Sequence, residues 1–315
     1  MQRGVGWHVS TCTTLALLAF AGNSLLCRAA LRDTAIDAAS FTGLRLASGA
    51  LVLWLLVRVR GGMAGTSGTG DATGTSSISS ASSTAGTAGS RATAFAAGSW
   101  RSALALFAYA AAFSFAYLQL SAATGALLLF GAVQATMISR GLMLGERFSA
   151  RQLGGFALAV LGLLALLLPG VSAPPISAAL LMLGAGIAWG VYSLRGRGAG
   201  DATAVTAGNF LRAVPMAAVL SLLMLDQAQL DTAGVLYALA SGALTSGLGY
   251  ALWYAALPQL RASTAATLQL SVPVITALAG VALLAEPISP RLLLASVAVL
   301  GGVWMVVLRR KPAAA

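Results

Sequence analysis

Two arginines interrupt stretches of this sequence that are otherwise apolar. Arg45 lies in "TGLRLASGALV" (42–52), and Arg212 lies in "NFLRAVPMAAV" (209–219). A guanidinium is a permanent cation with five N–H donors, so in an apolar environment it can bind an anionic group such as a carboxylate. Alternatively, it satisfies backbone carbonyls where helices break, or extends to the membrane interface. Both arginines are candidates for substrate binding, with a scaffold role as the alternative.

Amides and aromatic rings supply further groups for a cavity between helices. Gln134 and Gln269 lie near the middle of apolar stretches, where an amide either faces a cavity or bonds to a neighbouring helix. Trp189 belongs to another such stretch. Tyr250 and Trp253 share a helical face with four small residues, Gly242, Thr245, Ser246 and Gly249. We expect the three aromatic side chains to wall an amphipathic pocket, the alternative being an interfacial aromatic belt.

Two carboxylates stand at the ends of apolar stretches, each with an arginine nearby. Glu146 is followed by Arg151, and Glu286 is followed by Arg291 at the same spacing. A negative charge at the C-terminal end of a helix is unfavourable, so each glutamate needs a compensating cation. We interpret the four residues as two structural helix corners held by ion pairs, with proton coupling as the alternative.

The composition indicates that the chain lies in a lipid bilayer. Of its 315 residues, 58% are hydrophobic and 9% are charged, and the mean hydropathy is +0.86, whereas soluble domains carry about 25% charged residues. The net charge of +11 does not indicate a nucleic-acid partner, because most cations flank apolar stretches. The sequence has one histidine, His8, and its two cysteines, Cys12 and Cys27, are too far apart on one helix to pair. We therefore expect no metal and no cofactor.

The apolar stretches predict an all-α integral membrane protein with ten transmembrane helices. Each stretch approaches the 20 or so residues that cross the hydrocarbon core. The third and fourth stretches are nearly continuous and are expected to join through a tight turn near "QLSAATG". The ten predicted spans cover residues 9–27, 38–57, 101–120, 122–144, 152–169, 176–194, 203–225, 234–256, 263–285 and 290–308.

The connections predict how the helices are oriented. Residues 61–99 are almost all Gly, Ser, Thr or Ala, which is typical of a flexible, water-exposed loop, and we interpret them as a tolerated insertion. If the N-terminus is cytoplasmic, fourteen of the nineteen Lys and Arg residues fall in cytoplasmic segments and three, Arg28, Arg32 and Arg291, fall outside. The positive-inside rule therefore predicts that both termini are cytoplasmic.

The second half of the sequence repeats the first. When Glu146 is aligned with Glu286, Ser149, Arg151 and Gly162 align with Ser289, Arg291 and Gly302. An earlier, looser match aligns Arg45 with Arg212. Each repeat holds five predicted spans, and because five is odd the second copy enters the membrane inverted. Two inverted five-helix repeats are typical of transporters that expose a central site alternately to each side.

The repeat also carries the resemblance to a known family. The segments "AFAGNSLLCRAAL", "MLGERFSARQLGGFALAVLGLL", "AGIAWGVYSLRGR" and "LLAEPISPRLLLASVAVLGGVWMV" resemble the ten-helix, EamA-like branch of the drug/metabolite transporter superfamily. The chain departs from the family pattern at Ala21, where the family usually has tryptophan, and at Val133, where it usually has proline, although Pro273 keeps that proline in the second half. The resemblance implies a first repeat over residues 1–169, a second over 170–315, and export of amino acids or other small metabolites.

These observations predict a secondary transporter of the bacterial inner membrane that works by alternating access. Its expected partners are the lipid bilayer, a small-molecule substrate, and a proton or exchange substrate as the coupling species. A multidrug or lipid exporter of the same fold is the alternative. We do not expect an enzyme, because the sequence lacks a cluster of acids or histidines and a glycine-rich phosphate loop beside a strand.

Overall fold

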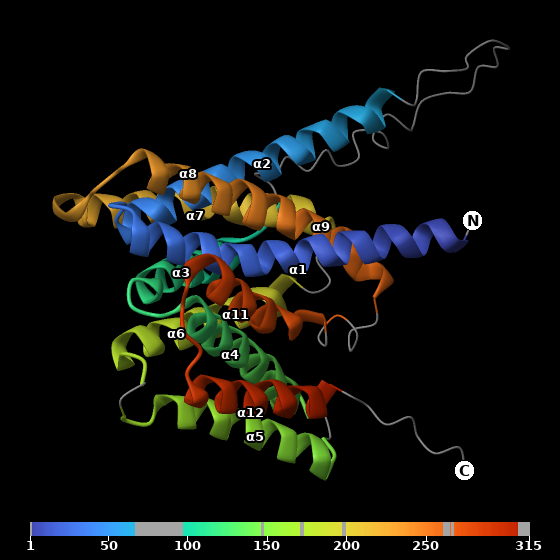
Figure 1. Cartoon of the computed structure of the whole chain (residues 1–315). Helices are drawn as coiled ribbons and strands as arrows, with labels where there is room; N and C mark the ends of the chain where they lie inside the picture. The colour runs from blue at the N-terminus through green and yellow to red at the C-terminus, as the bar shows by residue number, and fades with distance from the viewer. Residues whose placement is uncertain are drawn as a thin grey trace, which may run out of the picture.

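The computed structural model describes residues 2–66, 97–145, 148–170, 173–196, 200–260, 265 and 268–307. Within these ranges the chain is helical and has no strand (Figure 1). The elements are α1 (Gln2–Asp33), α2 (Ala38–Thr66), α3 (Trp100–Tyr117), α4 (Ala122–Met143), α5 (Ala150–Leu167), α6 (Ile176–Gly196), α7 (Ala202–Leu223), η1 (Leu225–Gln227), α8 (Thr232–Ala240), η2 (Ser241–Leu248), α9 (Gly249–Ala256), η3 (Leu257–Gln259), α11 (Ser271–Leu284) and α12 (Pro290–Val307).

In the described part of the chain, eight helical segments are long and apolar enough to cross a membrane. A further helix, α11, is apolar but has only 14 residues. The 18-residue helix α3 is not among the eight, because Arg101 and two tyrosines lower its hydropathy. The predicted all-α class is confirmed for the described residues, while the count of ten spans stays a prediction. Helix α2 continues to Thr66, beyond the predicted start of the loop at residue 61, and residues 67–96 of that loop lie outside the described part of the chain.

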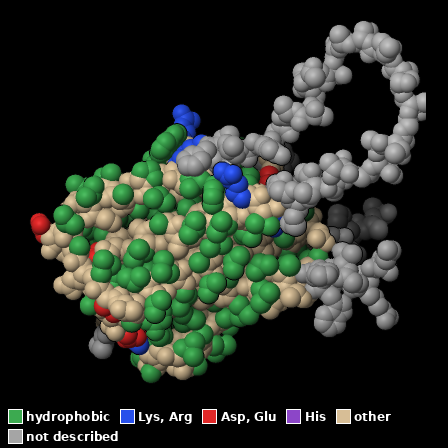
Figure 2. All heavy atoms as spheres, turned by 90° about the horizontal axis from the view of Figure 1, so that it is seen from above, with side chains coloured by type: hydrophobic (Ala, Val, Ile, Leu, Met, Phe, Trp, Pro, Cys, Tyr) green, Lys and Arg blue, Asp and Glu red, His purple; other side chains and the backbone are tan. Residues whose placement is uncertain are grey.

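The surface of the described helices is apolar. On the face seen in Figure 2, hydrophobic side chains cover most of the area, and the few charged side chains in view lie towards its margins. Large side chains project outwards from the α5–α12 pair, where Leu161 is 61% exposed and Leu294 is 72% exposed. Water would penalise such a surface, whereas hydrocarbon tails would cover it at no cost.

Polar side chains end the helices where the chain reverses direction. Helix α3 ends at Tyr117, and Ser121 caps α4 by accepting a hydrogen bond from the Thr124 N–H, so the predicted tight turn is confirmed. Asp37 caps α2, and its carboxylate also accepts a hydrogen bond from the Gln229 N–H at 3.0 Å. Burial alone would raise the pKa of Asp37, but hydrogen bonds from Ser40, Gln229 and Ala39 outweigh it and lower the pKa below its ordinary value. The ionised carboxylate therefore ties the α1–α2 turn to the segment before α8.

The predicted eighth span is not a uniform α-helix. It consists of α8, a π-helical turn η2 and α9, which together form one long apolar segment. A Cβ atom at Gly242 would fall on the Ser48 hydroxyl and the Arg45 carbonyl oxygen, so the absence of a side chain lets η2 press against the backbone of α2. Short π-helical turns of this kind frequently occur at functional sites.

The helices pack in pairs that combine the two halves of the chain. Helix α5 lies along α12 at the bottom of Figure 1, and α2 lies along α7 near the top. Helix α1 packs on the α8–η2–α9 segment and on α11, while α6 packs on α3 and α4. Glycines bring α5 and α12 into backbone contact, since a Cβ atom at Gly155 would lie 2.6 Å from the Gly302 carbonyl oxygen.

The α5–α12 contact predicts a difference between two adjacent glycines. A Cβ atom at Gly302 would fall on the Gly155 carbonyl oxygen and 2.7 Å from the Ala159 nitrogen, whereas a Cβ atom at Gly301 would meet nothing within 4 Å. Gly302→Ala should therefore destabilise the protein by about 1–3 kcal/mol through overpacking. Gly301→Ala should leave stability unchanged or raise it by up to about 1 kcal/mol. Unfolding of the purified protein in mixed micelles measures both, and equal effects would contradict this packing.

Candidate functional site

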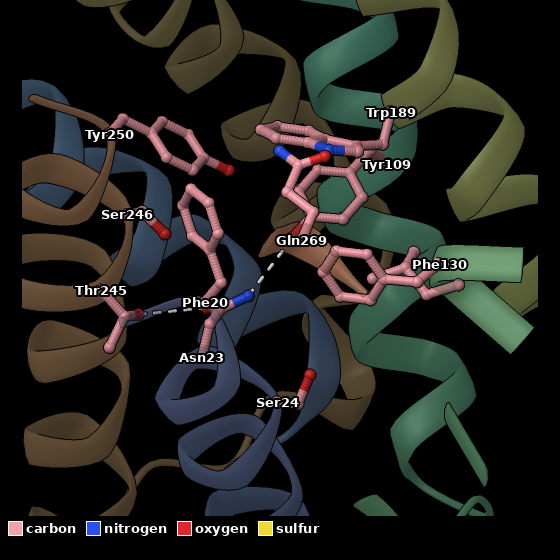
Figure 3. Close-up of a pocket in the computed structure, with 11 residues that line it drawn as sticks. Phe20, Asn23, Ser24, Tyr109, Phe130, Trp189, Thr245, Ser246, Tyr250 and Gln269 are labelled. Carbon is pink, nitrogen blue, oxygen red and sulfur yellow. Dashed lines mark hydrogen bonds between the residues drawn. The ribbon is translucent and has the colours of Figure 1, made fainter. Parts of the chain in front are cut away.

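One pocket lies inside the bundle, between helices from both halves of the chain (Figure 3). Its empty volume, which includes space open to the surroundings, is about 420 Å³. Helices α1, α3 and α4 contribute to it from the first half, and α6, η2, α9 and the residue two before α11 contribute from the second. The lining residues are Phe20, Asn23, Ser24, Tyr109, Leu129, Phe130, Trp189, Thr245, Ser246, Tyr250 and Gln269.

Asn23 connects three helices at the wall of this pocket. Its Nδ2 donates to the Tyr109 hydroxyl at 3.2 Å, and its Oδ1 accepts from the hydroxyls of Ser241 at 2.8 Å and Thr245 at 3.3 Å. In Figure 3, dashed lines join the Asn23 side chain to Thr245 and to Tyr109. Because the amide oxygen already accepts two hydrogen bonds from the protein, this residue fixes the wall and offers the pocket little acceptor capacity.

Aromatic rings form the opposite part of the wall. The Trp189 ring lies 4.9 Å from the Tyr109 ring and 5.1 Å from the Tyr250 ring, measured between centroids. Phe20 meets Tyr250 edge to face at 5.8 Å. These rings come from α1, α3, α6 and α9, so they join the halves of the molecule through contacts of about 0.5–1.5 kcal/mol each beyond their burial. They present flat apolar surfaces and a few hydroxyls to a bound solute.

Arg45 lies directly behind this wall. It is 2% exposed, its Nη2 donates to the Tyr109 hydroxyl at 3.0 Å, and its Nε lies 3.4 Å from the Ser246 hydroxyl. Its guanidinium also sits over the rings of Tyr109 and Phe113, at 5.3 and 4.9 Å from their centroids. The third nitrogen, Nη1, is buried and has no hydrogen-bond acceptor among the described residues. The site therefore holds a buried positive charge that the described part of the chain solvates incompletely.

The structure brings together some of the predicted site residues and separates others. Trp189, Tyr250 and Gln269 line the pocket, and Arg45 contacts two of its lining residues. Trp253 is buried beside the pocket, with its ring edge-on to Phe20. Gln134 is buried in α4, outside the lining.

Arg212 lies elsewhere and contacts backbone. Its Nη1 donates to the carbonyls of Ala97 at 2.6 Å and Gly208 at 2.9 Å, and its guanidinium lies 6.0 Å from the Trp100 ring. These contacts hold the start of α3 against α7. The two aligned arginines therefore have different surroundings, with Arg45 at the pocket and Arg212 at a helix junction.

Sequence reasoning missed several lining residues. Tyr109 and Phe20 were not singled out, because each is one aromatic residue among many in an apolar stretch. Asn23 both bridges helices and lines the pocket. A polar side chain in the middle of a span was the signal that could have identified both Asn23 and Tyr109.

The corner at Glu286 is built from different partners than expected. The Glu286 carboxylate is 2.9 Å from Nε of Arg28 and 3.8 Å from Nη1 of Arg32, and it accepts a hydrogen bond from the Ala122 N–H at 2.7 Å. Arg28 also donates to the Tyr117 carbonyl at 2.9 Å. Arg28, Arg32 and Glu286, called the corner cluster below, thus join α1, the α3–α4 turn and the end of α11.

The other corner residues make no comparable cluster in the described part of the chain. Arg291, the expected partner of Glu286, donates instead to the carbonyls of Ala165 and Leu168 at the end of α5. Arg151 is exposed at the start of α5, and Glu146 lies outside the described residues. The described residues include no group of three or more His, Cys, Asp or Glu side chains that could hold a metal ion.

Comparison with known proteins identifies the class to which this fold and pocket belong. The EamA-like transporter family matches residues 176–308. The chain is 56% identical over 298 residues to Uncharacterized protein PA1977 of Pseudomonas aeruginosa, with 95% of this chain and 94% of that protein covered. The chain is therefore a multi-pass membrane protein of the drug/metabolite transporter type and belongs to the EamA-like transporter family.

A solved structure shares the fold of the whole chain. It superposes with a TM-score of 0.61 at 18% identity, covering 94% of this chain and 97% of its own, and it is described as a crystal structure of a protein. At this identity the similarity extends to the fold alone.

The bridging role of Asn23 predicts energetic coupling between Asn23 and Tyr109. In a double-mutant cycle of Asn23→Ala and Tyr109→Phe, we expect a coupling free energy of about 0.6–2 kcal/mol, the range of interhelical hydrogen bonds in membranes. The measurement is unfolding of the full-length protein in mixed micelles. A matched cycle of Asn23→Ala with Tyr192→Phe, whose hydroxyl faces Asn209, should be additive within about 0.5 kcal/mol. Equal coupling in the two cycles would contradict the hydrogen bond.

Proposed function

We propose that this protein is a secondary transporter that exports a small metabolite, an amino acid or a related compound, across the bacterial inner membrane. The observation that carries the proposal is the pocket lined by helices from both halves of an apolar bundle. A buried cation and several hydroxyls in such a place are costly, and polar groups within membranes generally mark a solute path.

Reciprocal contacts support two inverted five-helix repeats. In the sequence alignment Gly162 corresponds to Gly302, and Ala159 corresponds to Val299. Across the α5–α12 pair, Gly162 packs against Val299 and Gly302 packs against Ala159. The second contact joins the counterparts of the two residues that make the first. A two-fold axis generates pairs of contacts related in this way. Helix α1 packs on the α8–η2–α9 segment, and α6 packs on α3. In both cases the first helix of one repeat contacts the third helix of the other.

Alternating access requires that one side of the pocket close while the other opens. The corner cluster supplies a closure at one end, because Glu286 of the second half binds both Arg28 and the first N–H of α4. In Figure 1 the first residue of α1 and the last residue of α12 lie on the same side of the molecule. With the positive-inside rule, both termini are cytoplasmic and the corner cluster is at the outer end.

Transport by reconstituted protein tests the proposal. Proteoliposomes loaded with labelled amino acids and related metabolites should release or exchange at least one solute faster than equally loaded vesicles without protein. Trp189→Ala and Tyr250→Ala should reduce the rate at least tenfold, because each removes a pocket wall. Leu294→Ala, a change on the 72% exposed outer surface, is the control and should leave the rate unchanged. If no solute in a broad metabolite panel moves, the proposal fails.

The proposed outer closure can be tested with a native cysteine. Cys27 is fully buried next to Arg28 on α1, so a membrane-impermeant maleimide should label it slowly in a Cys12→Ser background. Glu286→Gln removes the carboxylate charge that binds Arg28 and should increase labelling from the outer side several-fold. Asp226→Asn, a change at an exposed acid in η1, is the control. Unchanged labelling in Glu286→Gln would contradict a closing role for the corner cluster.

A further inference from the structure

Among the described residues, the positive charge of Arg45 has no carboxylate counterion. The six acidic residues in the described ranges lie at helix ends or in connections between helices: Asp33, Asp37, Asp201, Asp226, Asp231 and Glu286. The ion pairs among the described residues involve only Arg28 and Arg32. The rings of Tyr109 and Phe113 compensate part of the charge, but ring contacts are weaker than an ion pair. A buried, unpaired guanidinium is unfavourable, so a ligand that brings an anion to it gains that free energy.

The Tyr109 hydroxyl lies between the Arg45 guanidinium and the pocket. Its oxygen accepts hydrogen bonds from Nη2 of Arg45 at 3.0 Å and from Nδ2 of Asn23 at 3.2 Å. Both partners are donors, so the hydroxyl hydrogen is left for a third partner, which must be an acceptor. Tyr109 lines the pocket, and a hydroxyl polarised by a guanidinium is a stronger donor to an anion than to a neutral group.

Ser246, like Tyr109, faces Arg45 and also lines the pocket. Its hydroxyl oxygen lies 3.4 Å from Nε of Arg45. The oxygen of Asn23 is occupied by Ser241 and Thr245, so this part of the wall offers donors and little acceptor capacity. The described residues that line the pocket include no Asp or Glu to hold a cation. A lipophilic cation would therefore meet an unpaired positive charge.

Resting on the proposed function, we propose that the pocket selects small organic carboxylates. The carboxylate accepts hydrogen bonds from the hydroxyls of Tyr109 and Ser246, with Arg45 behind them as the balancing charge. The apolar or flat remainder of the solute lies against the rings of Trp189, Tyr250 and Phe20. The pocket thus rejects amines that have the same side group but no carboxylate, which separates it from exporters of cationic drugs.

Binding to the purified full-length protein in nanodiscs tests the selectivity. The probes form two series, one based on leucine and one on phenylalanine. Each series contains four matched compounds: the amino acid, its amide, its decarboxylated amine and its deaminated acid. Titrations followed by tryptophan fluorescence should give binding for the amino acid and the deaminated acid, and at least about tenfold weaker binding for the amide and the amine. Amines that bind as well as acids overturn the proposal, as does failure of every carboxylate in both series to bind. Transport of an amine would reject carboxylate selection while leaving the transporter function intact.

Three variants locate the selectivity. Tyr109→Phe keeps the ring and should weaken carboxylate binding about tenfold while leaving amide binding unchanged. Tyr192→Phe is the matched control, because Tyr192 lies outside the pocket lining and its hydroxyl faces Asn209. Arg45→Gln should abolish the preference for acids over amides. If Arg45→Gln does not fold, Tyr109→Phe still decides, and equal effects of the two tyrosine variants overturn the proposal.

Discussion

The buried guanidinium of Arg45 is the constraint around which this molecule is organised. A permanent cation with 2% exposure inside an apolar bundle is unfavourable unless its surroundings compensate it. The structure provides partial compensation from two neighbouring helices, α3 and η2, through the Tyr109 and Ser246 hydroxyls and the rings of Tyr109 and Phe113. The close approach of η2 to α2, which depends on Gly242, brings Ser246 to the arginine. The remaining deficit lies next to the pocket, where it would favour an anionic solute over a cationic one.

The rest of the bundle surrounds this charge with two kinds of helix contact. Glycine contacts lock α5 to α12, and these two helices present large apolar side chains to the outside. The helices that line the pocket are instead joined by aromatic contacts and single hydrogen bonds, such as those of Asn23. Weak directional contacts of this kind can be exchanged during a conformational change, whereas backbone-to-backbone packing of small residues is lost only if the helices separate.

Sequence and structure agree where the physical rule is local. Hydropathy located the helices, and two nearly continuous apolar stretches indicated a turn near "QLSAATG", where Ser121 caps α4. The membrane position of Arg45 was evident because a charge in an apolar stretch is rare. By contrast, Arg28 and Glu286 are separated by 258 residues, and the sequence suggested Arg291 as the partner only because it is near in the chain. The π-helical turn and the contact of Tyr109 with Arg45 likewise depend on tertiary packing, which no local pattern records.

The most direct test of the central claim is an experimental structure of the full-length protein in a lipid nanodisc with an excess of a small carboxylate. Our account predicts density for the solute in the pocket, with a carboxylate oxygen within hydrogen-bond distance of the Tyr109 hydroxyl and the aliphatic or aromatic group against Trp189. The account would be contradicted by a solute bound with its carboxylate away from Arg45, or by an acidic side chain of this chain paired with Arg45.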